Sequence, residues 1–304
     1  MPDIPQSDLQ FAETNNVTIA YDTFGQEGDA PLLLIMGLGS QMVLWDEDFC
    51  RQLASKGYRV IRFDNRDIGL STVFNRVAVP DLTAIIETLL RGEVPMLPYT
   101  LEDMARDAVA LLETLGHHSV HIVGESMGGM IGQIMAVRFP GHLRTLTSIM
   151  SSTGDPSLPP PNPEVLEILY KPFPTDRPGY IDAFVRAFQA LSGPVLPVGN
   201  ARARKWAEKS FDRGLNPPGV TRQYAAILAA GDRTAELNSI SIPTLVIHGD
   251  QDPLMPLECG RATAAAIPGA RLEIIEGMGH DLPHGGAWPQ IVDAIVDHTQ
   301  KNTT

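Results

Sequence analysis

Cysteine is scarce in this chain of 304 residues, and the scarcity excludes two kinds of protein. The two cysteines, Cys50 and Cys259, are too few for a disulfide framework. Neither stands at a spacing typical of zinc ligands. We expect both to be small apolar residues of a core, and we expect the protein to need no metal and no cofactor.

Positive charge is also in short supply. The chain has 23 lysines and arginines against 36 aspartates and glutamates, which gives a net charge of −13. Binding to the phosphates of a nucleic acid or to an anionic lipid surface needs clustered basic residues. The charge balance therefore argues against a nucleic-acid partner and against a membrane partner.

Long hydrophobic runs are absent from the sequence. The longest, residues 31–39, is far shorter than the roughly 20 residues of a membrane-spanning helix. The N-terminus lacks the basic start and the apolar segment of a signal peptide, which predicts a cytoplasmic protein. With 43% hydrophobic residues, the chain still has enough apolar side chains for a sizeable core.

Short apolar runs alternate with helical segments along most of the chain. The runs cover residues 32–36, 59–63, 120–123, 146–150, 244–247 and 272–275. Such runs are typical of strands buried on both faces of a parallel sheet. Residues 101–115 have helical periodicity, and Thr100 with Asp103 predicts a capping box at their start. We therefore predict an α/β fold: a mostly parallel central sheet with helices on both faces, preceded by two antiparallel edge strands within residues 9–23.

The alternation breaks between residues 154 and 238. Prolines at positions 156, 159, 160, 161 and 163 open this segment, where neither a helix nor a central strand can continue. Helical stretches follow, and one of them has an apolar stripe made by Tyr180, Phe184, Val185, Phe188 and Leu191. We predict a helical cap at residues 154–238, inserted in a core domain of residues 1–153 and 239–304. The stripe faces either the core of the cap or the substrate.

A Gly-x-Ser-x-Gly pattern occupies residues 124–128, after a predicted strand and before an apolar helix. In that context the pattern predicts a nucleophile elbow, a strained turn that presents Ser126 at the N-terminus of a helix. Gly124 and Gly128 allow neighbouring backbone to approach closely. The alternative is a glycine-rich turn without catalytic function.

A serine hydroxyl needs a base, and the base needs a group that orients it. His280 follows the predicted strand 272–275, and Asp252 follows the predicted strand 244–247. Because the carboxyl ends of parallel strands meet at one edge of a sheet, we expect both side chains near Ser126. Serine, acid and histidine also occur in the chain order typical of this arrangement.

Four motifs together resemble the α/β-hydrolase superfamily, and the resemblance covers nearly the whole chain. They read Ile-Met-Gly-Leu-Gly at 35–39, Arg-Phe-Asp-Asn-Arg-Asp-Ile-Gly-Leu-Ser at 62–71, Gly-Glu-Ser-Met-Gly-Gly at 124–129 and Gly-Met-Gly-His-Asp-Leu-Pro at 277–283. Within the superfamily, the chain resembles the branch that includes aclacinomycin methylesterase.

The resemblance implies a role for each site residue. Ser126 would be the nucleophile, His280 the base and then the acid, and Asp252 the group that holds the imidazole. The backbone N–H groups of Leu38 and Met127 would form the oxyanion hole. Many relatives have His-Gly at positions 36 and 37, where this chain has Met-Gly, but the contact needs only a backbone donor.

Other residues compete for these roles. Asp250, two residues before Asp252, and Asp155, after the predicted strand 146–150, are alternative acids. The position directly before a proline favours Asp252. His284 is an alternative base, although its position predicts that it lines the rim of the site.

Further clusters favour structural roles. We expect a solvated turn rather than a metal site for the histidines His117, His118 and His121. For the charged cluster of Asp64, Arg66 and Asp67 we expect a turn with a buried ion pair.

A basic run favours a solvated helix face; it consists of Arg202, Arg204, Lys205 and Lys209 with Trp206 and Phe211. Leu44 and Trp45 belong either to the pocket wall or to the core.

A serine at the elbow argues against haloalkane dehalogenase and epoxide hydrolase activity, since those enzymes use an aspartate there. The resemblance implies a serine carboxylic ester hydrolase that acts through an acyl-enzyme on small to medium, fairly apolar esters, as a monomer or a homodimer. Thioesterase, perhydrolase or haloperoxidase-like and carbon–carbon bond hydrolase activities stay open. So does a non-catalytic binding protein that kept the fold.

Overall fold

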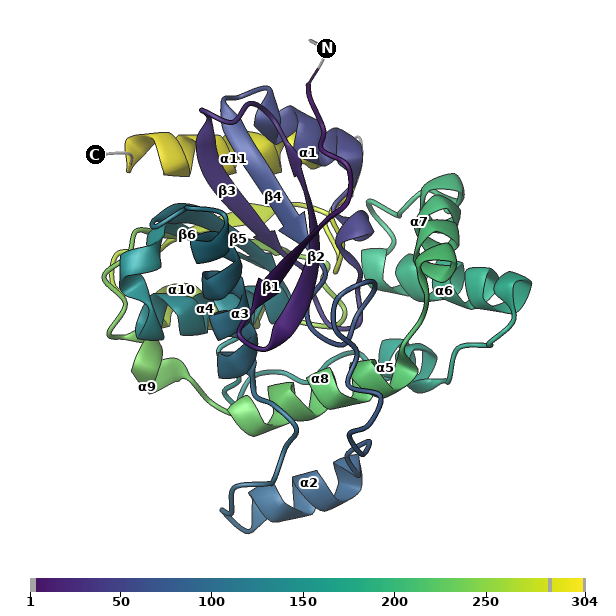
Figure 1. Ribbon diagram of the computed structural model, residues 1–304. Helices are drawn as coiled ribbons and strands as arrows, with labels where there is room; N and C mark the ends of the chain where they lie inside the picture. The colour runs from purple at the N-terminus through teal and green to yellow at the C-terminus, as the bar shows by residue number, and fades with distance from the viewer. Residues whose placement is uncertain (1–3, 284–285, 303–304) are drawn as a thin grey trace.

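The structure is a computed structural model that describes residues 4–283 and 286–302. Its strands are β1 (Gln10–Thr14), β2 (Val17–Phe24), β3 (Ala30–Ile35), β4 (Tyr58–Phe63), β5 (Val120–Glu125), β6 (Leu143–Ile149), β7 (Thr244–Gly249) and β8 (Arg271–Ile275). They form one sheet in the order β1-β2-β4-β3-β5-β6-β7-β8 (Figure 1). β1 pairs with β2 and β2 with β4 in antiparallel fashion, and the remaining pairs are parallel. The six predicted strands and the antiparallel edge pair are confirmed.

The helices fall between and around these strands. They are α1 (Glu47–Ala54), α2 (Leu82–Leu90), α3 (Leu101–Thr114), α4 (Met127–Arg138), α5 (Pro163–Tyr170), α6 (Arg177–Ser192), α7 (Asn200–Arg213), α8 (Pro217–Ala230), α9 (Thr234–Leu237), α10 (Leu257–Ala266) and α11 (Trp288–Lys301). The capping box predicted for α3 is present, since Thr100 accepts from the Asp103 N–H and Asp103 accepts from the Thr100 N–H. The predicted helix is therefore confirmed.

The sheet is covered by helices on both faces, as the alternation predicts. Along β3, Leu32 and Leu34 belong to the core cluster that also contains residues of α1 and α11. Leu33 and Ile35 belong to the other cluster, together with residues of α3 and α4. All four side chains are fully buried, and burying one such side chain contributes roughly 1.5–3 kcal/mol. The buried central strands thus give a rigid support to the loops that follow them.

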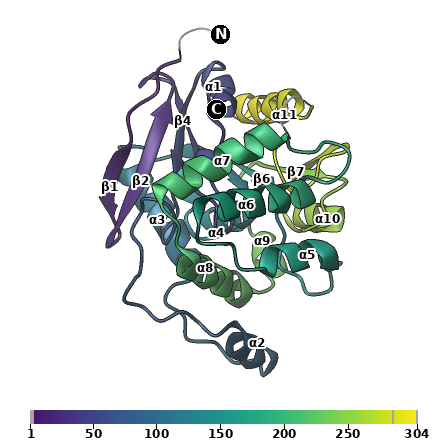
Figure 2. The same cartoon turned by 90° about the vertical axis from the view of Figure 1, so that its right-hand side faces the viewer.

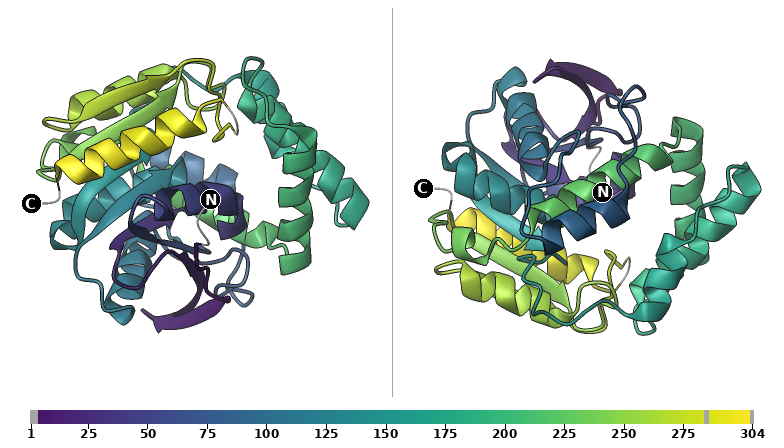
Figure 3. Two further views of the ribbon diagram at one scale, coloured as in Figure 1. Left: turned by 90° about the horizontal axis from the view of Figure 1, so that it is seen from above. Right: turned by 90° about the horizontal axis from the view of Figure 1, so that it is seen from below.

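The segment between β6 and β7 leaves the sheet. Its helices α6 and α7 stand to one side of the sheet in Figure 3, and α8 runs beside the core in Figure 2. The segment leaves and rejoins the core at one place, because the Arg233 N–H donates to the Thr153 carbonyl over 2.9 Å. Beyond that contact, Leu237 of α9 packs in the core cluster of α3 and α4. The cap boundaries 154–238 stay a prediction.

The apolar stripe of α6 packs within this excursion. The rings of Phe184 and Phe188 stack at 4.4 Å between centroids, and Phe188 lies 5.5 Å from the ring of Trp206 on α7. The ring of Tyr180 is tilted against those of Phe184 and Phe211, with centroids 5.9 Å and 5.6 Å away. Of the two alternatives, contact of the stripe with the excursion's own core is the one observed.

A second excursion was not predicted. The segment between β4 and α3 carries helix α2, which projects below α8 in Figure 1. Asp81 caps α2 by accepting from the N–H groups of Thr83 and Ala84. Only Ile85 of α2 is buried.

The cysteines occupy the positions expected of core residues. Cys50 and Cys259 are both free and buried. Burial raises the pKa of the Cys50 thiol to about 12, so this thiol stays protonated at neutral pH. The expectation of small buried side chains without a disulfide is confirmed.

Candidate active site

Ser126 occupies a strained turn between β5 and α4. Its backbone has φ +51° and ψ −118°, a conformation that residues other than glycine rarely adopt and that costs on the order of 1–3 kcal/mol. The turn is held because the Ser126 N–H donates to the Ile149 carbonyl over 2.9 Å. The side chain is partly exposed, so the sheet presents its hydroxyl at the end of β5.

The two glycines of the motif let three backbone segments meet below that serine. A Cβ on Gly124 would lie 2.2 Å from the Gly128 carbonyl oxygen. One on Gly128 would lie 2.1 Å from the carbonyl oxygen of Ile35, at the end of β3. Any side chain at either position would push α4 away from the sheet.

Three side chains from separate loops form one chain of hydrogen bonds. Ser126 Oγ lies 3.1 Å from His280 Nε2, and His280 Nδ1 lies 2.7 Å from Asp252 Oδ2. Asp252 comes from the loop after β7 and His280 from the loop after β8. The other oxygen of Asp252 accepts from the N–H groups of Leu254 and Met255. The geometry thus connects a hydroxyl to a base and the base to a fixed carboxylate.

The environment of His280 favours its charged form. Burial alone would lower the pKa of the imidazole, but the Asp252 carboxylate, through its charge and its hydrogen bond, holds that pKa above its usual range. An imidazolium at His280 is therefore stabilised.

Of the alternative acids, neither contacts His280. Asp250 accepts from the Gly277 N–H over 2.7 Å and so holds the loop that carries the histidine. Asp155 accepts from the Ser157 N–H in its own turn. The alternative base, His284, lies outside the described residues.

Two backbone segments adjoin Ser126: the start of α4, which carries Met127, and the loop after β3, which carries Leu38. Met127 is the first residue of α4, so its N–H has no acceptor within the helix. The loop after β3 passes close to the serine, since a Cβ on Gly37 would lie 3.3 Å from Ser126 Cβ. The oxyanion hole expected from Leu38 and Met127 stays a prediction.

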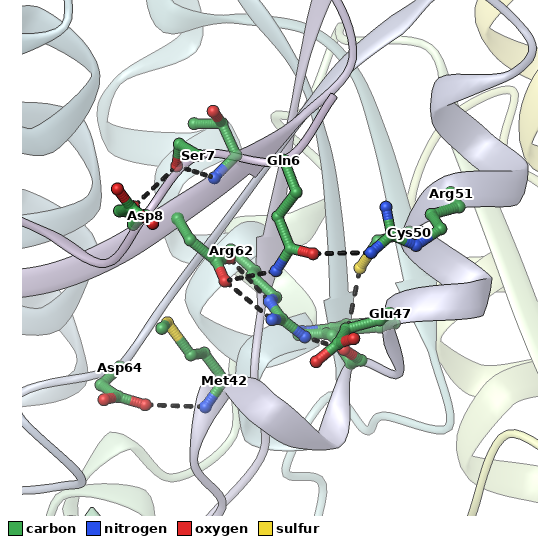
Figure 4. Close-up of polar contacts among 12 residues, drawn as sticks. Gln6, Ser7, Asp8, Met42, Glu47, Cys50, Arg51, Arg62 and Asp64 are labelled. Atoms are coloured by element: carbon green, nitrogen blue, oxygen red, sulfur yellow. Dashed lines mark hydrogen bonds and ion pairs between the residues drawn. The ribbon is translucent and has the colours of Figure 1, made fainter. Parts of the chain in front are cut away.

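The loop after β3 is fixed by contacts with the loop after β4. Asn65 Nδ2 donates to the Met36 carbonyl over 3.1 Å, and the Met42 N–H donates to Asp64 Oδ1 over 2.7 Å, as Figure 4 shows for the second contact. Arg62, also drawn in Figure 4, pairs with Asp22 and donates to the Trp45 carbonyl. The segment 36–45 is therefore held at both ends.

Comparison with known proteins shows to which family the chain belongs. Residues 30–287 match the family described as the alpha/beta hydrolase fold. The chain belongs to that family. It is 30% identical to the rhodomycin D methylesterase DnrP of Streptomyces peucetius, over 95% of this chain and 97% of that protein. It is 31% identical, over the same shares, to the rhodomycin D methylesterase DauP of Streptomyces sp. strain C5.

Solved structures agree on the fold of the hydrolase. The esterase RhEst1 from Rhodococcus sp. ECU1013 superimposes with a TM-score of 0.75 at 20% identity, over 97% of this chain and all of that one. The resemblance drawn from the four motifs, and the fold that it implied, are confirmed. Within residues 4–283 and 286–302, every helix of the hydrolase is too short or too polar to cross a membrane.

Two carboxyl groups that sequence reasoning did not single out flank His280. Burial raises the pKa of Glu125 and that of Asp281 to about 7 each. A Cβ on Gly37 would lie 3.7 Å from Glu125 Oε1, so this carboxyl faces the loop of Leu38. Both groups adjoin predicted site residues in the sequence, which was the available signal.

The charged cluster after β4 is a set of buried ion pairs. Arg66 binds Asp107 through two hydrogen bonds, Asp67 binds Arg222 in the same way, and Asp64 pairs with Arg213. The expected turn with a buried ion pair is confirmed. Two of the three partners come from α7 and α8, and no local pattern indicates them.

The other clusters differ in part from expectation. His121 is not in a solvated turn: it is buried in β5, bonds to Thr145 on β6, and burial lowers its pKa to about 4. The basic run lies on α7, where Arg202 pairs with Asp46 and Lys209 with Glu47 of the core. The expected solvated face holds for Arg204 and Lys205, which are exposed, whereas Arg202 and Lys209 pair with the core.

Core packing also accounts for Leu44 and Trp45. Leu44 and Trp45 are both buried in the core cluster of α1 and α11. Trp45 stacks on Phe49 with ring centroids 5.8 Å apart. Of the two alternatives for this pair, packing in the core is the one observed.

Proposed function

We propose that the protein is a serine carboxylic ester hydrolase that works through an acyl-enzyme. The observation that carries the proposal is the continuous chain from Ser126 Oγ through His280 to Asp252, with the serine held at a positive φ. Two relatives named methylesterases support the same class of reaction.

The first half of the reaction forms the acyl-enzyme. Ser126 Oγ attacks the ester carbonyl carbon while His280 Nε2 accepts its proton. The carbonyl oxygen becomes an anion and is bound by the N–H groups of Leu38 and Met127. Asp252 stabilises the imidazolium without taking its proton.

The second half releases both products. His280 gives its proton to the leaving alcohol, and the carbonyl forms again on Ser126. A water molecule then attacks the acyl-enzyme, with His280 as the base, and the carboxylic acid leaves. The partly exposed hydroxyl of Ser126 and the neighbouring loops give the water access to the acyl group.

The charges around the site favour neutral substrates. Glu125 and Asp281 flank His280, and either carboxyl in its ionised form repels a negatively charged acyl group. We therefore propose small to medium, fairly apolar esters, with methyl esters among the first to test because the two curated relatives are named for that activity. The predicted cap at residues 154–238 would shape the pocket. The cytoplasmic location and the state of a monomer or homodimer stay predictions.

A substrate panel tests the proposal. It contains p-nitrophenyl and methyl esters of increasing acyl length, one thioester, one amide and one vinylogous diketone, each offered to wild type and to Ser126→Ala. We expect esters to be hydrolysed fastest and Ser126→Ala to lose at least about 10⁴-fold in kcat. Faster turnover of the thioester or the diketone would replace the ester assignment, and activity retained in Ser126→Ala would contradict the mechanism.

A further inference from the structure

A glutamine on α8 binds the loop that carries one of the two oxyanion donors. We propose that Gln223 is a positioning residue for the oxyanion loop, residues 37–40, because its carboxamide connects Gly39 to the core and thereby fixes the Leu38 amide beside Ser126. The inference rests on the proposed function, since it assigns a task in the same reaction.

Both ends of the Gln223 carboxamide are used. Oε1 accepts from the Gly39 N–H over 3.0 Å, and Nε2 donates to the Arg66 carbonyl over 2.8 Å. The side chain of Gln223 is fully buried, and its bond to the Arg66 carbonyl is buried as well. A group that must accept on one side and donate on the other fits in only one orientation, and Gln223 therefore fixes the Gly39 N–H in direction as well as in place.

The helix that carries Gln223 is itself fixed to the core. Arg222, the preceding residue, makes two hydrogen bonds to the buried Asp67 carboxylate. Asn216, before the first turn of α8, donates to the Asp67 carbonyl over 2.8 Å. A Cβ on Gly39, whose φ is +67°, would lie 3.1 Å from a methyl group of Val220, so the loop also lies directly against α8.

These contacts make the position of Leu38 depend on a helix outside the sheet. On the N-terminal side the loop is held by the Asn65 bond to Met36, and on the C-terminal side by the Gln223 bond to Gly39. Without Gln223, the Gly39 N–H would lose its acceptor and the loop its connection to α8, so the loop would shift. The Leu38 N–H would then miss the oxygen anion, which exists only in the transition state and the intermediate. The loss should therefore appear in kcat and leave KM nearly unchanged.

The test compares Gln223→Met, Gln223→Glu and Asn216→Ala with wild type. Methionine keeps the length of the side chain and removes both hydrogen bonds. Asn216→Ala is the matched control, because it removes an amide contact between the same helix and the core without touching the oxyanion loop, while the two bonds from Arg222 to Asp67 still hold α8. The substrates are short p-nitrophenyl esters, and the inhibitor is a trifluoromethyl ketone, whose adduct with a serine carries an oxygen anion.

Removing an oxyanion donor outright costs about 10²–10³ in kcat, and a displaced donor should cost less. We expect Gln223→Met to lose about 10–100-fold in kcat with KM within about threefold, and to bind the trifluoromethyl ketone more weakly by a similar factor. Asn216→Ala should change each quantity by less than about threefold. Equal losses in Gln223→Met and Asn216→Ala, or a loss confined to KM, would overturn the inference.

Gln223→Glu keeps the proposal testable if the methionine variant does not fold. A protonated glutamic acid can accept from Gly39 and donate to Arg66 as the glutamine does, but its carboxylate is repelled by the Arg66 carbonyl. The kcat of Gln223→Glu relative to wild type should therefore fall as the pH rises from 6 to 9. A ratio that stays at the wild-type value throughout would overturn the inference. A wild-type protein that hydrolyses none of the esters would instead contradict the proposed function.

Discussion

Replacing Asp252 by asparagine should disable His280 by fixing the wrong tautomer. Asp252 Oδ1 accepts from two backbone N–H groups, at 2.9 and 2.7 Å, while Oδ2 faces His280 Nδ1. In Asp252→Asn, the amide oxygen will keep the place between the two N–H donors, and the NH₂ group will face the imidazole. Nδ1 must then act as the acceptor, which puts the imidazole proton on Nε2 and leaves Ser126 without a base.

The expected loss in kcat is about 10⁴-fold, which corresponds to roughly 5.5 kcal/mol of barrier. The fold should survive, since the contacts of Oδ1 persist and the change conserves shape. The assay is kcat on a short p-nitrophenyl ester, with thermal unfolding as the check on folding. Because the Asp252 carboxylate raises the pKa of His280, and because the base must be neutral, the acid limb of residual activity should move to lower pH in the variant.

The matched control is Asp250→Asn, two residues away. Asp250 only accepts from the Gly277 N–H, and an asparagine oxygen can do the same. We expect this variant to keep its kcat within about threefold. If Asp252→Asn kept more than about a tenth of the activity, or if Asp250→Asn lost the larger share, the reasoning would be refuted.

Three further predictions concern stability, each read from denaturant unfolding. Gly128→Ala should cost about 3 kcal/mol or more, because its Cβ would lie 2.1 Å from the Ile35 carbonyl oxygen; a loss under about 1 kcal/mol would contradict the packing described. Arg222→Met should cost roughly 3–5 kcal/mol, because it leaves the buried Asp67 charge without its partner, and an unchanged midpoint would contradict that. Burial raises the pKa of Asp281 to about 7, so the stability that its protonated form gives is complete below about pH 4 and lost as the pH rises to about 7. Asp281→Asn should remove this loss of stability with rising pH, which amounts to roughly 2–4 kcal/mol. If the free energy of unfolding fell equally with pH in both proteins, the prediction would be contradicted.

Local patterns were enough to predict the framework of the site. Continuous apolar runs such as residues 32–36 predict buried strands, because both faces of a central strand are apolar. Ser126, Asp252 and His280 were expected together because loops after parallel strands meet at one edge, and the structure places them within hydrogen-bond distance.

Contacts between distant segments were not predictable in this way. Gly39 and Gln223 are separated by 184 positions, and nothing in the residues around either one indicates the bond. The bond between His121 and Thr145 is of the same kind, although the burial of His121 followed from the predicted strand 120–123. In α2, by contrast, a signal was available: Asp81 precedes a run of helix-forming residues and does cap the helix.

Labelling by a serine-directed phosphonate tests the central claim most directly. Purified wild-type protein is incubated with a fluorophosphonate probe, and the labelled peptide is identified by mass spectrometry. We expect one label per chain at Ser126, fast in wild type and in Asp250→Asn and at least about 10³-fold slower in Asp252→Asn. Folded wild-type protein that takes no label, or takes it at another serine, would contradict the proposal that Ser126 is the nucleophile of an ester hydrolase.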